Sequence, residues 1–144
     1  MSIFQTAREL PASPAAVFAA IRHPERLARW WGPAGFSNTF EQFEFHPGGQ
    51  WKFTMHGPNG TNYANASEFT EIVPDVKVVI RHQSEPHFTL SITLSPSATG
   101  TLVEWVQAFD SPEVAAAVRH IVEPANEQNL DRLTAEVSAA KHGS

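Results

Sequence analysis

The side chains that could transfer protons or hold a metal ion are few in this sequence and poorly spaced for either task. The stretch RHQSEPH contains His82, Glu85 and His87, which are residue types that bind transition metals. Their spacing crosses a proline-containing loop and matches no standard zinc pattern, and the chain has no cysteine. His120 and Glu123 could exchange protons, but the helical pattern around them indicates an exposed face. We therefore predict no catalytic residue, no metal site and no bound cofactor.

Amide side chains at positions predicted to be buried suggest binding instead. Asn65 and Gln107 each alternate with aromatic residues along a predicted strand, and Asn126 lies on the apolar face of a C-terminal helical segment. A buried amide without a partner costs about 1–3 kcal/mol. These amides therefore either form a hydrogen-bonded network in the core or bind the polar groups of a ligand. Amides orient a bound molecule but do not exchange protons at neutral pH, which favours binding over catalysis.

Aromatic residues would supply the apolar surface for such a ligand. Trp30 and Trp31 are predicted to close a short helix, because Gly32 and Pro33 follow them directly. The pair either packs this helix onto the core or contacts a ligand at the rim of a pocket, with Trp31 the preferred contact. The complete set of predicted ligand contacts is Trp31, Trp51, Phe53, Met55, Tyr63, Asn65, Trp105, Gln107 and Asn126.

Prolines separate the elements that must position these residues, because proline lacks a backbone donor and favours turns and first helical turns. Periodicity predicts strands over 3–10, 36–45, 51–55, 63–73, 76–82, 88–94 and 103–109. Two short helices begin at Ser13-Pro14 and His23-Pro24, and a long helix runs from 111 to about 140. The irregular period of 36–45 predicts a bulge, and Pro124 predicts a kink in the long helix.

Seven strands with short turns predict one antiparallel sheet, and a single long helix is available to cover it. The predicted architecture is an α+β fold in which a curved seven-stranded antiparallel sheet wraps around the long C-terminal helix, with two short helices after the first strand. Residues 1–144 form one domain, with a frayed tail at about 141–144. A curved sheet around a helix is expected to leave an internal cavity, and the helix carrying Trp30 and Trp31 would plug one end.

Four segments carry a resemblance to a known family: ARWWGPAGF, FHPGGQWKFTMHGPNGTNY, EIVP and ANEQNLDRL. In this order they resemble the START-like (SRPBCC) superfamily and, within it, the branch named after homologues of the activator of heat-shock-protein-90 ATPase. The resemblance spans nearly the whole chain. It implies the helix-grip fold and a cavity that binds a small, mostly apolar molecule. Members of the superfamily include lipid carriers, hormone receptors, polyketide cyclases and co-chaperones, so the fold does not select one activity.

The expected function is binding of a small hydrophobic molecule, such as a lipid, an aromatic metabolite or a polyketide-like compound, in this internal cavity. The alternative is a polyketide cyclase-like or hydrolase-like enzyme that uses the same cavity. That alternative needs an acid or base inside the cavity, and periodicity places no Asp, Glu or His there. A third hypothesis, a co-chaperone-type stress-response protein, follows from the family name alone.

Composition bounds the expected partners. The chain of 144 residues has a formal net charge of −5, and its ten Lys and Arg residues are scattered. No basic stripe exists for nucleic acid or an anionic membrane surface, and no nucleotide-binding or serine-hydrolase motif occurs. The N-terminal MSIFQTAREL has no long apolar run, so we expect a cytoplasmic protein without a signal peptide or membrane span. The chain is expected to be a monomer or a homodimer.

Overall fold

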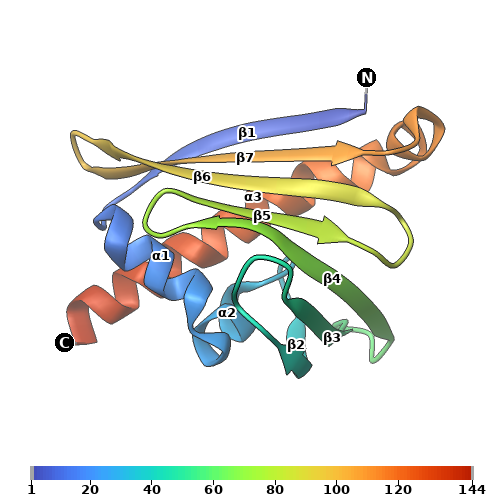
Figure 1. The fold of residues 1–144 in the computed structure, drawn as a ribbon, viewed down its shortest axis with the longest axis horizontal. Helices are drawn as coiled ribbons and strands as arrows, with labels where there is room; N and C mark the ends of the chain where they lie inside the picture. The colour runs from blue at the N-terminus through green and yellow to red at the C-terminus, as the bar shows by residue number, and fades with distance from the viewer. Residues whose placement is uncertain (1, 144) are drawn as a thin grey trace.

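A computed structural model describes residues 2–143, with side chains placed for residues 2–139. This part of the chain forms one seven-stranded sheet and three helices (Figure 1). The predicted order of one strand, two short helices, six strands and a long helix is confirmed. The elements are β1 (Ile3–Leu10), α1 (Pro14–Arg22), α2 (Pro24–Trp30), β2 (Ser37–Phe43), β3 (Gln50–His56), β4 (Asn62–Val73), β5 (Lys77–His82), β6 (Phe88–Ser97), β7 (Gly100–Phe109) and α3 (Pro112–Gly143).

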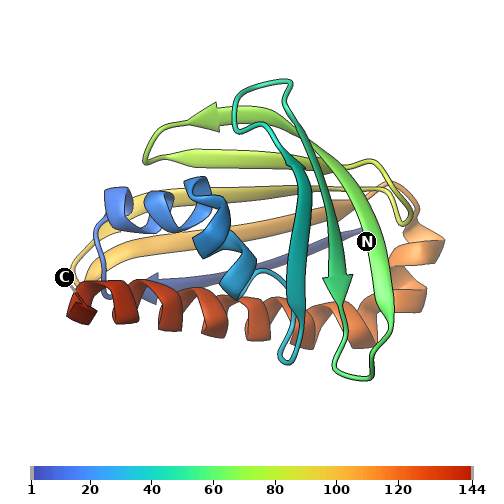
Figure 2. The same ribbon diagram turned by 90° about the horizontal axis from the view of Figure 1, so that it is seen from below.

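The strands pair in the order β1-β7-β6-β5-β4-β3-β2, and every neighbouring pair is antiparallel. The first strand lies beside the last, since Ile3 pairs with Ala108 and Leu10 with Thr101. Figure 2 shows the sheet curving over α3, which runs along its concave side, while α1 and α2 lie between them near one end. The predicted α+β fold, with the long helix across the concave face, is confirmed.

Two irregular positions help the sheet to curve. The register of β2 shifts between Phe40 and Gln42, so the predicted bulge is present at Glu41. A second shift, which was not predicted, lies between Phe69 and Glu71 on β4. Because a bulge bends its strand and increases the local twist, both let the β2–β4 end of the sheet fold toward α3.

Both short helices begin where the sequence predicted, but α2 ends one residue earlier than predicted. Ser13 caps α1, since its hydroxyl accepts a hydrogen bond from Ala16 N at 3.2 Å. Helix α2 ends at Trp30, and Trp31 follows it in an extended conformation (φ −67°, ψ 133°) rather than on the helical face predicted for it. Gly32 then adopts φ +96° before Pro33, which explains the break, because that backbone conformation favours glycine.

Helix α3 is longer than predicted and continues to Gly143 instead of about Ala140. The predicted frayed tail at 141–144 falls on residues whose side chains are not described, and Ser144 lies outside the description altogether. Pro124 lies inside the helix, and its kink stays a prediction. The C-terminal half of α3 buries Leu130, Leu133 and Val137 against the main core.

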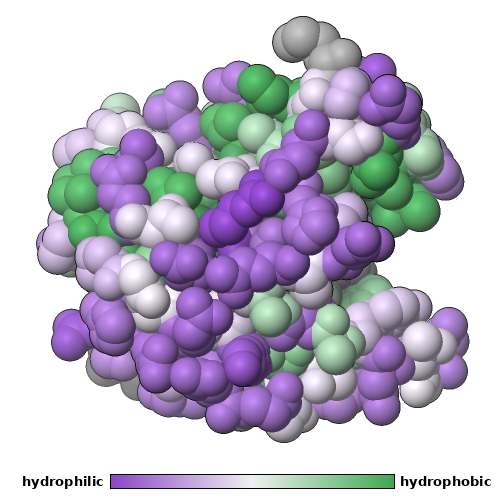
Figure 3. Space-filling model, turned by 45° about the vertical axis from the view of Figure 1, so that its right-hand side comes forward, coloured by the Kyte–Doolittle hydropathy of each residue, from purple (hydrophilic) through white to green (hydrophobic). Residues whose placement is uncertain are grey.

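The interior contains two apolar clusters. The main core joins α1, α2 and the C-terminal half of α3 to the sheet and holds all four tryptophans. A smaller cluster under the N-terminal half of α3 contains Phe4, Phe109 and Ala115, with Phe88, Val118 and Val122 packed against it. The face in Figure 3 is mostly hydrophilic and shows hydrophobic side chains only in separate patches. No helix in the described part of the chain is both long and apolar enough to cross a membrane.

Candidate functional site

An aromatic cluster on the concave face contains four of the nine predicted contact residues. The ring centroid of Trp31 lies 5.0 Å from that of Trp51, 6.1 Å from Trp105 and 6.5 Å from Phe53. Trp51 also stacks on Phe53 at 4.2 Å. Trp31 is only 8% exposed, so it lies inside the cluster rather than at an exposed rim. The extended conformation after α2 turns this ring into the core.

Met55 and Tyr63 are placed at the margin of this cluster. Met55 is half-buried and lies against Gly32, where an added Cβ would come within 2.7 Å of its Cε. Tyr63 is 46% exposed, with its ring 6.0 Å from that of Phe36. These two predicted residues therefore occupy the open side of the β3–β4 hairpin and not the closed interior.

Polar side chains of α3 hold the loop that carries Trp31, and sequence reasoning missed them. Asn129 is buried, accepts a hydrogen bond from Gly32 N at 3.3 Å and donates one to Trp30 O at 2.9 Å. The Arg132 guanidinium donates to five carbonyl oxygens at 2.7–3.1 Å, those of Arg29, Trp31, Gly32, Pro33 and Phe36. Burial lowers the pKa of Arg132 from its ordinary value. The spacing of Asn129 and Arg132 at i and i+3 was the available signal for a shared helix face.

Two of the three predicted amides meet. Asn126 Nδ2 donates to Gln107 Oε1 at 3.1 Å, between α3 and β7. One such bond uses one donor and one acceptor, so the pair retains one amide NH₂ group and one carbonyl oxygen whichever way the amides are oriented. Neither retained group bonds to the described part of the chain. The pair can therefore bind both a donor and an acceptor.

The third amide, Asn65, lies in a separate polar pair. Its Oδ1 lies 2.7 Å from His82 Nε2, and its Nδ2 donates to Tyr63 O at 2.9 Å. His82 is only 6% exposed, and its burial was not predicted from the sequence. The missed signal was parity, because His82 ends β5 on the same face as Val78 and Ile80.

Burial keeps His82 uncharged near neutral pH. Its desolvation lowers the pKa of the imidazole, against the opposing effect of its hydrogen bond to Pro86 O at 2.8 Å. The ring also stacks on Phe88, with centroids 4.5 Å apart. Nδ1 must donate to the Pro86 carbonyl, so Nε2 of the neutral ring accepts a hydrogen bond, and the Ser84 hydroxyl at 3.3 Å is the donor beside it.

This burial predicts a pH dependence of stability. Because the pKa of His82 is lowered in the folded state, its contribution to stability is complete above the unfolded-chain pKa of about 6.5 and is lost as the pH falls below it. We expect the free energy of unfolding, measured by urea denaturation, to fall more steeply below about pH 6.5 in the wild type than in His82→Gln. Equal slopes in the two proteins would show that His82 does not titrate with folding.

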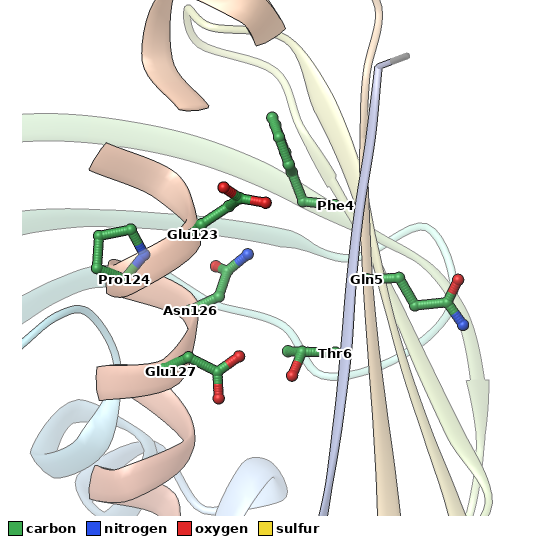
Figure 4. A pocket seen from close by; sticks show the side chains of 7 residues that line it. All are labelled: Phe4, Gln5, Thr6, Glu123, Pro124, Asn126 and Glu127. Carbon is green, nitrogen blue, oxygen red and sulfur yellow. The ribbon is translucent and has the colours of Figure 1, made fainter. Parts of the chain in front are cut away.

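A pocket of about 330 Å³ opens between β1 and α3 (Figure 4). In Figure 4, Phe4 and Thr6 point toward α3 while Gln5 points to the other side of β1. The pocket reaches the amide pair, because Asn126 lines it and Phe4 pairs with Gln107 in the sheet. Its lining residues are Phe4, Gln5, Thr6, Glu123, Pro124, Asn126 and Glu127.

A second pocket, of about 410 Å³, lies where the β5–β6 loop meets the start of α3. Its lining combines apolar Pro86, Val114 and Val118 with polar residues of the loop and with Asp110. The two pockets thus flank the N-terminal half of α3. Within the described residues, no three His, Asp or Glu side chains come close enough together to hold a metal ion.

A curved antiparallel sheet that grips a C-terminal helix defines a START-like, helix-grip protein. Over residues 11–138 the sequence matches the family described as Activator of Hsp90 ATPase homolog 1-like protein. The chain belongs to this family.

Solved structures share the fold at low sequence identity. A crystal structure from Nitrosomonas europaea has a TM-score of 0.89 at 19% identity, covering 97% of this chain and 96% of its own. One from Chromobacterium violaceum has a TM-score of 0.82 at 24% identity, covering 94% and 96%. A solution structure from Arthrobacter aurescens has a TM-score of 0.88 at 25% identity, covering 95% and 86%. No curated protein matches the sequence significantly.

Proposed function

We propose that the protein binds a small hydrophobic molecule, such as a lipid, an aromatic metabolite or a polyketide-like compound, between the concave face of the sheet and α3. The observation that supports this most is the amide pair of Gln107 and Asn126. The pair lies between two apolar clusters and retains one donor and one acceptor without a partner in the described chain. A few polar groups placed among apolar walls are typical of small-molecule sites.

The pocket between β1 and α3 supports a route to this pair. Its volume of about 330 Å³ is within the range of small-ligand pockets, and Asn126 belongs both to the pocket and to the amide pair. Thr6 on the pocket wall pairs with Trp105 on the neighbouring strand β7. The aromatic cluster therefore begins on the strand next to the pocket. A ligand entering beside β1 would meet the amides first and the indoles behind them.

Binding accounts for these groups better than catalysis does. Both ring nitrogens of His82 face polar groups of the chain, Nδ1 the carbonyl of Pro86 and Nε2 the side chains of Ser84 and Asn65. The carboxylates that line the pocket are exposed and paired with arginines, Glu123 with Arg119 and Glu127 with Arg8. The cytoplasmic location and the monomeric or dimeric state stay predictions from the sequence.

Replacing Asn126 with leucine tests this function. We expect the affinity for the neutral fluorescent naphthyl ketone Prodan to fall about tenfold, because the ligand loses a hydrogen bond inside the site. The free energy of unfolding should change little or rise, since binding groups are often held at some cost to the fold. Fluorescence titration and urea denaturation give the two values.

Gln5→Leu is the matched control, because Gln5 lies on the same wall but points away from the pocket. It should leave Prodan binding unchanged. If Asn126→Leu instead destabilises the protein by about 1–3 kcal/mol and leaves affinity intact, the amides serve only each other. A native mass spectrum of the protein purified from the organism that encodes it would reveal the mass of a retained ligand.

A further inference from the structure

Three buried hydrogen-bond donors on the concave face have no partner in the described part of the chain. They are the Nε1–H groups of Trp51 and Trp105 and the hydroxyl of Ser67, in residues that are 0%, 2% and 1% exposed. Trp30 provides the contrast, because its equally buried Nε1–H donates to Ala20 O at 2.9 Å. Buried donors are nearly always paired in folded proteins, so three unpaired ones on one face require an explanation.

These donors belong to residues in or beside the aromatic cluster. Ser67 pairs directly with Trp51 in the β3–β4 ladder, so the hydroxyl and the indole are neighbours on the same face. Trp31 contacts both Trp51 and Trp105, with centroid distances of 5.0 and 6.1 Å. Asn38 Oδ1, a buried acceptor that also lacks a partner in the described chain, lies on β2, and its amide nitrogen donates to Trp31 O. The cluster therefore offers mainly donors to a bound molecule.

Three basic side chains of α3 and β5 are uncharged or already engaged. The Arg132 guanidinium is occupied by five loop carbonyls, as described above. Arg81 forms an ion pair with Asp110 at 2.6 Å, and burial lowers the pKa of His82. None of these three is available to pair with a carboxylate bound among the indoles, and a buried unpaired charge is strongly disfavoured.

We propose that Trp51, Ser67 and Trp105 bind oxygen acceptors of the ligand, and that the ligand is an uncharged aromatic or polycyclic molecule with carbonyl or hydroxyl groups. This inference rests on the proposed function and names the class of ligand. Aromatic ligands fit because the side chains around these donors are themselves aromatic, with Phe53 and Phe69 stacked on Trp51 at 4.2 and 5.6 Å. A site of this kind would select against fatty acids and other carboxylates.

Three related probes separate these properties. They are the neutral ketone Prodan, the same dimethylaminonaphthalene without its ketone, and the corresponding naphthoate, which is an anion. All three share the aromatic skeleton, so they differ in the acceptor and the charge. We expect Prodan to bind about tenfold more tightly than either of the others in calorimetric or fluorescence titration, because only Prodan supplies a neutral acceptor.

Variants that remove single donors assign the contacts. Ser67→Ala removes one oxygen atom, and Trp51→Phe and Trp105→Phe remove the indole N–H while retaining an aromatic ring. Each should weaken Prodan binding about three- to tenfold and leave the ketone-free probe within about twofold. Trp30→Phe is the matched control, because its N–H is already bonded to Ala20 O. It should not change the preference among the probes.

The outcomes distinguish failure of this inference from failure of the proposed binding function. If the three probes bind equally, or if each variant weakens all probes alike, the donors do not contact the ligand and the inference is overturned while binding stands. An indole N–H that points at a neighbouring ring face would give this result. If no probe binds the native protein, the proposed function fails as well. Ser67→Ala keeps the test valid even if a tryptophan variant does not fold.

Discussion

Gly49→Ala is expected to lower the free energy of unfolding by about 3 kcal/mol or more, the upper range for overpacking. A Cβ at this position would overlap the carbonyl oxygen of Glu44 and lie 2.9 Å from His46 O, and neither backbone atom can rotate away. The turn is also fixed to the sheet, since Phe69 N donates to Gly49 O at 3.0 Å. Urea denaturation followed by tryptophan fluorescence measures the loss.

Gly48→Ala is the control for this prediction. Gly48 adopts φ +85°, but an added Cβ would have no atom within 4 Å. Its substitution should therefore cost only the strain of a left-handed conformation, about 1–2 kcal/mol. If the two neighbouring substitutions prove equally costly, the close approach of Glu44 to Gly49 does not determine the result.

Arg132→Met is expected to destabilise the protein by about 3 kcal/mol, because it leaves several loop carbonyls without the charged donor they share. Arg132→Lys should recover only part of the loss, since an ammonium has three donors on a single nitrogen and cannot span the loop. Both variants should also weaken Prodan binding, because the same loop positions Trp31. Urea denaturation and fluorescence titration provide these measurements.

Arg119→Met controls for the loss of a positive charge on α3. Arg119 pairs with Glu123 at 3.4 Å on the exposed side, where 65% of its side chain is accessible. Its replacement should leave stability nearly unchanged, as is usual for exposed ion pairs. A stable Arg132→Met protein with normal ligand binding would contradict the role of Arg132 in holding the loop.

The fold could be predicted because the residues that begin and end its helices and strands act locally. Prolines and capping residues act on their immediate neighbours, so the starts of α1 and α2 follow from Ser13-Pro14 and His23-Pro24. Residue parity likewise indicated the inward face of β7. The conformation of Trp31 was predicted incorrectly because helical spacing at i+4 matched its position, while Gly32 and Pro33 ended the helix one residue earlier.

The site could be predicted only in part, because its contacts join distant segments. The sequence predicted that Gln107 and Asn126 lie on faces that turn inward, and the two side chains do form a hydrogen bond. The partner of Asn65 depends on the register between β4 and β5, which a single sequence does not contain. The contacts of Arg132 span about 100 residues, and periodicity carries no information at that separation.

The pairing of β1 with β7 has a consequence for biosynthesis. Ile3 pairs with Ala108, which is synthesised much later. Strand β1 therefore stays unpaired on the nascent chain until most of the protein has left the ribosome. The loop at Trp31 is anchored later still, because Arg132, which binds its carbonyl oxygens, is synthesised after β7. The proposed ligand site is therefore the last part to be assembled, and a chain terminated before α3 would expose its indoles to the cell's quality-control machinery.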